Sequence, residues 1–213
     1  MKKIQTKQSG FTLVEIAIVL VIIGLLLGSV LKGQELIYNQ KIKATYALYR
    51  QYTAAMYGYQ DRYQALPGDD GSATSRGFTP APADPAIVNG NANGWIDGGG
   101  TCTSTSDGPT AEVCQANYHM RLAGFLTGDG TVSPTHSFGG TVILVRSDAI
   151  VGGWSNPTSV CWEWLTNRAA QQIDSTYDDG QATSGSMRGN ANYTAAFTTT
   201  PDGLSASWTC MTN

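Results

Sequence analysis

An unbroken apolar segment dominates the beginning of the chain. It runs from Phe11 to Leu31, and only three of its residues are polar, namely Thr12, Glu15 and Ser29. About 20 apolar residues are enough for a helix to cross the hydrocarbon core of a bilayer. Residues 1–10 carry three lysines and no acid, and positive charge beside an apolar segment keeps that end in the cytoplasm. We therefore expect a membrane-spanning helix at 11–31, with residues 1–10 inside the cell and everything after Leu31 outside it.

The helical pattern continues beyond the apolar segment but becomes amphipathic. Apolar residues recur there at steps of three or four positions, the period of one helix face: Leu48, Tyr52, Met56, Tyr59 and Tyr63. The first proline is Pro67, which together with Gly68 stops a helix. The pattern predicts one long helix over residues 11–65, and we expect its aromatic stripe to pack against a globular head.

Residues 66–213 show another pattern, in which short apolar runs separate clusters of Gly, Asn, Asp and Ser. Such runs predict strands, here at 141–145 and 195–199, and residues 128–130 suit a tight hairpin turn. Residues 160–174 predict a strand that enters a short helix at 162–173. The expected fold is α+β, with the long N-terminal helix packed on a globular head that contains an antiparallel sheet.

Composition and charge narrow the class of protein. The chain has 213 residues, which suits one ordinary domain plus an appendage. The net charge is −3, and nothing indicates the stripe of basic residues that nucleic-acid binding requires. No nucleic-acid partner is therefore expected. Charged residues make up only 14% of the chain, and the second half is rich in small polar residues, as is typical of a loop-rich extracellular domain.

The four cysteines are Cys102, Cys114, Cys161 and Cys210. Their spacings do not match a zinc site, and only two histidines accompany them. An even number of cysteines beyond a membrane segment predicts two disulfides in an oxidising compartment. Three pairings are possible, and sequence order favours Cys102–Cys114 with Cys161–Cys210; the alternative is four unrelated buried thiols.

The sequence contains no recognisable catalytic motif. Neither His119 nor His136 lies in a zinc-protease or triad motif, and no phosphate-binding or dinucleotide-binding loop is present. We expect His119 to be a structural residue near a helix. The chain is therefore not expected to be an enzyme, and no cofactor other than calcium is considered.

One loop has the residue order of a calcium-binding EF-hand. Oxygen-bearing side chains stand at the first, third, fifth and ninth positions, namely Asn89, Asn91, Asn93 and Asp97, with Gly94 at the sixth. The bidentate Glu expected at the twelfth position is replaced by Gly100. Further charge would have to come from Glu112, Asp69 or Asp70, so the alternative is an Asn/Gly-rich turn without an ion.

Residues 10–15, Gly-Phe-Thr-Leu-Val-Glu, follow a short basic leader and open the apolar helix. This motif resembles the cleavage signal of type IV prepilins, the family of pilins, minor pilins and pseudopilins. The resemblance implies that a prepilin peptidase cuts between Gly10 and Phe11 and N-methylates Phe11, leaving residues 1–10 as the leader. It also implies that the mature chain moves from the inner membrane into a helical filament with residues 11–31 in its core. The alternative is a plain single-pass anchor with an accidental Glu15.

Glu15 gains a possible partner through this cleavage. The new α-amine of Phe11 lies four residues before Glu15, on the same helix face, and a carboxylate at membrane depth normally has a partner. Gly24 and Gly28 form a GxxxG pair that either lets helices approach closely or reflects the ordinary tolerance of Gly in membrane helices. Many family members have a proline where this chain has Lys32, which leaves open whether the helix unwinds there on assembly.

The resemblance predicts a structural function. We expect a subunit of a type IV pilus or pilus-like filament, which sits in the inner membrane before assembly and on the cell surface afterwards. Its partners would be copies of itself, other pilins, the prepilin peptidase and an inner-membrane assembly platform. The alternatives are a pseudopilin of a type II secretion or competence system, and a minor tip pilin that acts as an adhesin-like binding module.

Overall fold

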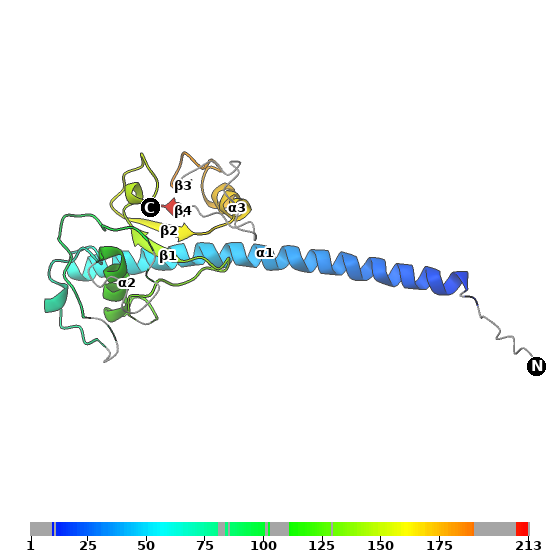
Figure 1. Cartoon of the computed structure of the whole chain (residues 1–213), viewed down its shortest axis with the longest axis horizontal. Helices are drawn as coiled ribbons and strands as arrows, with labels where there is room; N and C mark the ends of the chain where they lie inside the picture. Colours follow the sequence, from blue (N-terminus) through cyan, green and yellow to red (C-terminus); the bar gives the residue numbers. More distant parts are fainter. Residues whose placement is uncertain are drawn as a thin grey trace, which may run out of the picture. The chain divides into compact units, whose positions relative to one another are not determined.

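A computed structural model describes residues 10, 12–80, 84, 86–100, 102, 111–128, 130–189 and 208–212. The chain divides into two compact units, Met1–Gln40 and Lys41–Asn213. One continuous helix, α1 (Leu13–Tyr63), contributes to both units (Figure 1). The helix is two residues shorter at each end than the predicted 11–65, and Phe11 lies outside the described residues.

Within the first unit, the part of α1 from Leu13 to Leu31 is almost entirely apolar. An 18-residue window of the helix has a mean hydropathy of 2.8, and none of it is buried inside the protein. Leu13, Leu25 and Leu31 each keep at least 66% of their surface exposed. By length and composition, this part of α1 can cross a membrane.

Within the second unit, α1 buries one face. Its fully covered residues include Tyr49, Tyr52, Met56 and Tyr59, at the steps of three and four that define a helix face. The predicted stripe is therefore confirmed in its middle, whereas Leu48 and Tyr63 are only half-buried and Tyr49 takes the inner position. The helix ends because Gln64 adopts a left-handed backbone conformation, with φ of 55°, and Pro67 cannot continue a helix.

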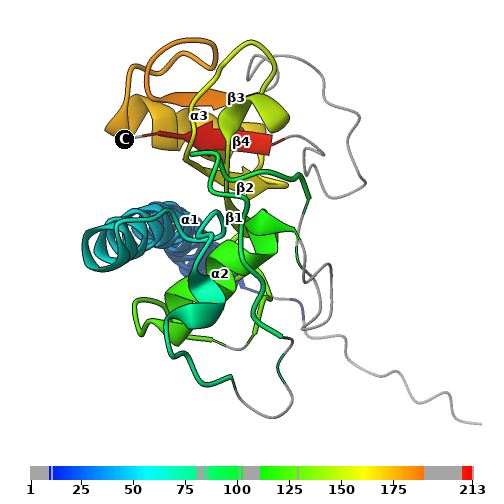
Figure 2. The same ribbon diagram turned by 90° about the vertical axis from the view of Figure 1, so that its left-hand side faces the viewer.

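The head contains one antiparallel sheet, as the α+β prediction required. Its strands are β1 (Val142–Val145), β2 (Ser159–Glu163), β3 (Met187–Gly189) and β4 (Trp208–Met211). They pair in the order β1-β2-β4-β3 (Figure 2), with every neighbouring pair antiparallel. The strand predicted at 141–145 is confirmed as β1, and the one predicted at 195–199 lies outside the described residues.

Helix α2 (Glu112–Leu122) lies against β1 and contributes to the core of the head. Its residues from Glu112 to Met120 are all buried. Both disulfides lie in the same apolar cluster: Cys102 pairs with Cys114 of α2, and Cys161 of β2 pairs with Cys210 of β4. This is the pairing that sequence order favoured.

The structure corrects two local predictions. The helix predicted at 162–173 begins later, because β2 continues to Glu163 and Trp162 lies opposite Thr209 in the sheet. Helix α3 (Asn167–Tyr177) starts only after Thr166, whose hydroxyl accepts a hydrogen bond from the N–H of Ala169 at 3.2 Å and caps the helix.

The hairpin predicted at 128–130 is also wrong, since no strand of the described chain flanks this turn. Instead, the guanidinium of Arg121 donates to the carbonyls of Thr127 at 3.3 Å and Gly130 at 2.8 Å. The arginine therefore holds the turn after α2. Two short 3₁₀ helices, Ala73–Ser75 and Ser147–Ala149, complete the described elements.

Candidate functional site

The beginning of α1 forms a capping box. The N–H and the hydroxyl of Thr12 both donate to Oε2 of Glu15 at 2.8 Å, and the Thr12 hydroxyl accepts from the N–H of Glu15 at 3.3 Å. A Thr followed three residues later by Glu satisfies the otherwise unpaired N–H groups of a helix end in this reciprocal way. Glu15 therefore has a local structural role as well as the assembly role predicted for it.

Sequence reasoning missed this cap although the signal was present. The order Thr-x-x-Glu directly before an apolar run is a recognised start signal of helices. The predicted cleavage position stands just ahead of the cap: Gly10 is exposed, and Phe11 lies outside the described residues. Cleavage there would leave Thr12 and Glu15 in the mature chain, so the cap does not depend on the leader.

The two glycines of the GxxxG pair do not serve packing within this chain. A Cβ atom placed on Gly24 or Gly28 would meet no other atom within 4 Å. Their small size matters only if another molecule approaches the helix, as in a membrane or a filament.

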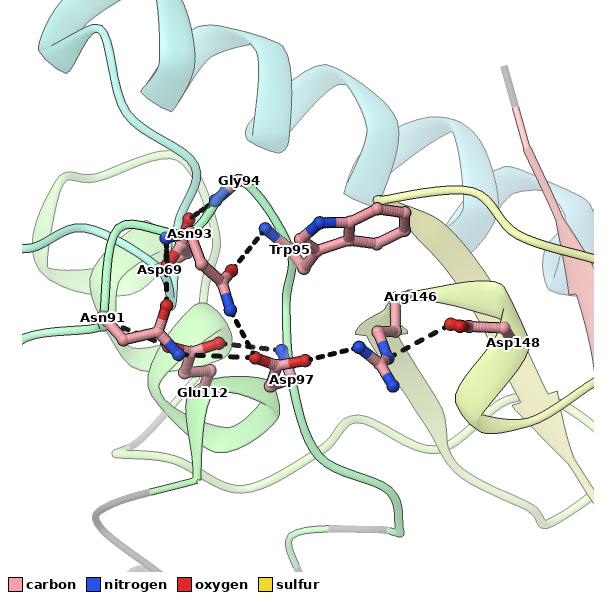
Figure 3. A network of polar contacts seen from close by, with 9 residues as sticks. All are labelled: Asp69, Asn91, Asn93, Gly94, Trp95, Asp97, Glu112, Arg146 and Asp148. Atoms are coloured by element: carbon pink, nitrogen blue, oxygen red, sulfur yellow. Dashed lines mark hydrogen bonds and ion pairs between the residues drawn. The ribbon is translucent and has the colours of Figure 1, made fainter.

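The EF-hand-like loop forms a network of polar contacts in the head (Figure 3). Two carboxylates from outside the loop reach it, as sequence analysis had considered, and both accept hydrogen bonds from loop backbone. Asp69 accepts from the N–H of Asn93 at 3.0 Å and of Gly94 at 2.7 Å. Glu112, in the first turn of α2, accepts from the N–H of Asn91 at 2.9 Å and of Asp97 at 2.8 Å. Burial raises the pKa of Glu112, and the nearby charges of Asp69 and Asp97 add to this effect.

The third carboxylate that sequence analysis considered faces another part of the head. Asp70 is buried and accepts hydrogen bonds from the Tyr59 hydroxyl at 2.7 Å and the Ser72 N–H at 2.9 Å, and it pairs with Arg76 at 3.0 Å. Burial opposes the charged form of Asp70, but the hydrogen bonds from Arg76, Tyr59 and Ser72 together lower its pKa. The Asp70 carboxylate therefore fixes the chain after α1, and only the backbone carbonyl of Asp70 reaches the loop, where it accepts the N–H of Gly90 at 3.0 Å.

Close packing also fixes the loop against the segment after α1. A Cβ atom on Gly90 would lie 2.3 Å from the backbone of Asp69, and one on Gly68 would lie 2.4 Å from the carbonyl oxygen of Glu112. Only glycine permits such close backbone approach. The two glycines thus bring Asp69 and Glu112 to the loop.

The loop's own charged residue, Asp97, binds nitrogen atoms with both carboxylate oxygens. Its Oδ2 accepts from the side-chain amides of Asn93 at 2.7 Å and Asn91 at 3.3 Å. Its Oδ1 pairs with the guanidinium of Arg146 at 3.0 Å. These hydrogen bonds and the arginine charge lower the pKa of Asp97, with the bond from Asn93 as the largest cause.

This arrangement does not fit a calcium ion. Calcium binds oxygen atoms, but the amide groups of Asn91 and Asn93 turn their nitrogen atoms toward Asp97. Their oxygen atoms accept the N–H groups of Asn93 and Trp95, at 2.9 and 2.8 Å, and Asn89 likewise accepts the N–H of Thr74 at 2.8 Å. The EF-hand residue order is therefore used here for a network of hydrogen bonds.

A second acidic group is present on α3 and the turn that follows it. Oxygen atoms of Asp174, Asp178 and Asp179 lie within 4.8 Å of one another. Each carboxylate accepts a backbone N–H from the segment between α3 and the start of β3: Asp174 from Gly180 at 2.8 Å, Asp178 from Met187 at 2.7 Å and Asp179 from Gln181 at 2.9 Å. Their common role is to hold the turn, which accounts for the three acids without an ion.

Both histidines serve as buried structural links. His119 receives the N–H of Gly68 at Nδ1, 3.0 Å away, and its Nε2 lies 3.1 Å from the carbonyl of Val88. Because a carbonyl only accepts, Nε2 carries the proton and the ring is neutral. Burial lowers the pKa of His119 to about 4. His136 makes the same kind of link between the Phe138 N–H, at 3.2 Å, and the Glu163 carbonyl, at 2.7 Å.

A groove of about 590 Å³ lies along the last turns of α1. Its lining is mixed and includes Tyr57, Gln60 and Gln64 of the helix end and Pro157 and Thr158 of the loop before β2. Tyr57 keeps half of its surface exposed. The groove therefore offers an aromatic face and side-chain amides, without a catalytic group among these residues.

Comparison with known proteins places the N-terminal region in a defined class. Residues 5–31 match the family described as the prokaryotic N-terminal methylation motif, which is the type IV prepilin signal. No curated protein and no solved structure shows significant similarity to the chain. The motif confirms the resemblance drawn from residues 10–15 and supports a type IV pilin-like protein that is processed at its N-terminus.

Proposed function

We propose that this protein is a structural subunit of a type IV pilus or pilus-like filament. The observation that carries the proposal is the prepilin motif at residues 5–31, which includes the first part of a helix of 51 residues. The resulting chain has a processing signal, a segment able to cross a membrane and a disulfide-bonded head, in that order. These are the parts that a subunit needs for storage in the inner membrane and polymerisation on the outside.

The exposed surface of α1 supports the polymerisation step. Between Leu13 and Ile37, its large apolar side chains are exposed in the isolated chain, and in water each would lose about 1.5–3 kcal/mol of transfer free energy. Lipid covers them before assembly, and neighbouring copies of the same helix would cover them in a filament core. The amphipathic half keeps the head attached to this core.

Glu15 would link processing to assembly. Cleavage after Gly10 frees the amine of Phe11, which can neutralise the carboxylate within one chain or bind the carboxylate of a neighbouring subunit. The second arrangement would fix the axial step between subunits. Separating a buried charge pair costs about 3–5 kcal/mol, so only subunits in the correct register would join the filament.

Imaging of sheared surface material from cells with and without this gene tests the proposal. We expect filaments that disappear with the gene, with this chain as their main band in mass spectrometry. If filaments persist and the chain is scarce in them, it is not their structural subunit. Loss of protein secretion without loss of surface filaments would instead identify a pseudopilin.

The groove at the end of α1 favours a second candidate function, a binding module at a filament tip. Tyr57, Gln60 and Gln64 combine an aromatic face with amide donors and acceptors, a chemistry that suits neutral oligosaccharides. Binding of chitotetraose or cellotetraose to the detergent-solubilised full chain, abolished by Tyr57→Ala, would support this function. Equal signals from the wild type and Tyr57→Ala would remove it.

A further inference from the structure

We propose that Arg146 takes the place of the metal ion in the EF-hand-like loop, so that residues 89–97 hold their shape without calcium. The proposal concerns the head alone and does not depend on whether the chain forms filaments. In this loop, the order of the residues and the geometry of their side chains do not agree. The loop has the order of a calcium site, but a guanidinium group supplies the positive charge at its acidic end.

The orientation of the loop amides is fixed by their backbone partners. A backbone N–H can only donate, so the N–H groups of Asn93 and Trp95 require the oxygen atoms of the Asn91 and Asn93 side chains. The nitrogen atoms of these amides consequently face Asp97. A calcium ion at this position would meet N–H donors instead of the oxygen ligands that it prefers.

The outside carboxylates stabilise the same arrangement. Each oxygen of Glu112 and of Asp69 accepts one backbone N–H of the loop, at distances of 2.7 to 3.0 Å. Glu112 also stands at the beginning of α2, where negative charge is favourable. Recruiting these carboxylates to an ion would weaken the hydrogen bonds that shape the loop.

Arg146 is placed at the loop by both its backbone and its side chain. It directly follows β1, and its N–H donates to the carbonyl of Ile96 at 3.0 Å. Its guanidinium pairs with Asp97 at 3.0 Å and with Asp148 at 3.1 Å (Figure 3). It also lies 5.9 Å from the centre of the Trp95 ring. One cation thus joins two carboxylates, as a divalent ion would, and ties the loop to the edge of the sheet.

The test compares thermal unfolding of the detergent-solubilised full chain in excess EDTA and in millimolar Ca²⁺. For the wild type we expect the same Tm in both. For Arg146→Gln we expect a Tm lower by about 3 °C or more in EDTA, because Asp97 and Asp148 then lose the cation that both bind. Calcium should raise the Tm of this variant only, since the ion can bind where the guanidinium was, at Oδ1 of Asp97 and at Asp148, without displacing the amide nitrogens that face Oδ2 of Asp97. Arg50→Gln, on an exposed position of α1, is the matched control and should leave Tm unchanged.

Each alternative result overturns the proposal. A rise of the wild-type Tm with Ca²⁺ would show that the loop binds calcium despite Arg146. A Tm of Arg146→Gln equal to that of Arg50→Gln would show that the arginine does not hold the loop, and no response of Arg146→Gln to Ca²⁺ would show that it does not stand in for an ion. If Arg146→Gln does not fold, Asp148→Asn, which removes one of the two ion pairs, takes its place. This variant should lower the Tm by a smaller amount, and the Tm of the wild type should still not respond to Ca²⁺.

Discussion

The two units of the chain use the helix α1 in opposite ways. Between Leu13 and Ile37, its large apolar side chains are exposed, with Leu20 at 63% and Leu26 at 60% of their surface. From Lys41 onward, Tyr52 and Tyr59 are buried almost completely, at 1% and 0%. The first unit therefore depends on surroundings outside the chain, either lipid or other copies, whereas the second makes its own core. Substitutions in the first unit should affect assembly, and substitutions in the second should affect stability.

Loss of the carboxylate at Glu15 should have the largest effect, and that effect should be on assembly. We expect Glu15→Ala to reduce the yield of sheared filaments about 100-fold, since stranding one member of a buried charge pair costs about 3–5 kcal/mol. Cleavage of the leader, measured by mass, should remain intact. Glu35→Ala is the control, because Glu35 lies in the same unit and its ion pair with Lys32 is exposed.

Glu15→Gln separates the charge of Glu15 from its capping role. Glutamine can still close a capping box with Thr12, but it cannot pair with an amine as a carboxylate does. We expect this variant to assemble as poorly as Glu15→Ala. Normal filaments from Glu15→Gln would mean that the cap, and not the charge pair, is what assembly requires.

A matched pair of alanine substitutions on α1 tests the comparison directly. Tyr52→Ala removes a buried ring and the hydrogen bond that its hydroxyl donates to Asn117 at 2.8 Å, so it should lower the free energy of unfolding of the head by about 3–5 kcal/mol. Leu20→Ala should change it by less than about 0.5 kcal/mol. All five tryptophans lie within residues 95–208, so denaturation followed by tryptophan fluorescence reports on the head. A similar loss of unfolding free energy in both variants would contradict the difference between the two units.

The two disulfides should contribute unequally to the stability of the head. Cys161–Cys210 closes a separation of 49 residues and Cys102–Cys114 one of 12. By loop-closure entropy, their removal as paired serine variants should cost about 4 and about 3 kcal/mol respectively. In both double variants, the yield of filaments should decrease only in proportion to the fraction of chains whose head is unfolded. Urea denaturation of the two double variants measures the order, and a larger loss for the shorter loop would contradict the entropic account.

The head should lose stability in mild acid because of His119. Its pKa is about 4 in the folded chain and about 6.5 when unfolded, so only the unfolded state takes up the proton as the pH falls below 6.5. The contribution of His119 to the free energy of unfolding is thus complete above its pKa in the unfolded chain, and it declines as the pH falls toward its pKa in the folded chain. From about pH 7.5 to about pH 5 the loss amounts to about 2 kcal/mol.

The variant His119→Gln isolates this contribution. The change of the urea midpoint between about pH 7.5 and about pH 5 should be smaller in the variant than in the wild type. The variant itself should be less stable than the wild type. Burial also lowers the pKa of His136, so a smaller acid effect of the same sign should remain. An unchanged pH dependence in His119→Gln would exclude His119 as its source.

The parts that could be predicted from sequence are those fixed by neighbours in the chain. The apolar segment, the helix period and the motif at residues 10–15 are local patterns, and all three lie in or beside α1. Helix α2 was not predicted as an element because Gln115 and Asn117 look like surface residues, yet both are buried. Their burial depends on partners elsewhere, such as the Tyr52 hydroxyl for Asn117.

The loop at residues 89–97 shows the same limit at a candidate site. Its residue order suggested calcium, and Glu112 and Asp69 were correctly considered as additional carboxylates. The partner that changes the chemistry is Arg146, which stands in a different part of the sequence and reaches Asp97 only because β1 ends beside the loop. No spacing within the loop carries that information.

Analysis of the N-terminus of assembled protein tests the central claim most directly. Mass spectrometry of the chain recovered from sheared filaments should find a mature form that begins at Phe11, carries a methyl group on its amine and lacks residues 1–10. That result would show that the motif at residues 5–31 is processed and that the mature helix enters the filament. Filaments that contain the chain with an intact Met1 would contradict both processing at Gly10 and the pairing of Glu15 with the amine of Phe11.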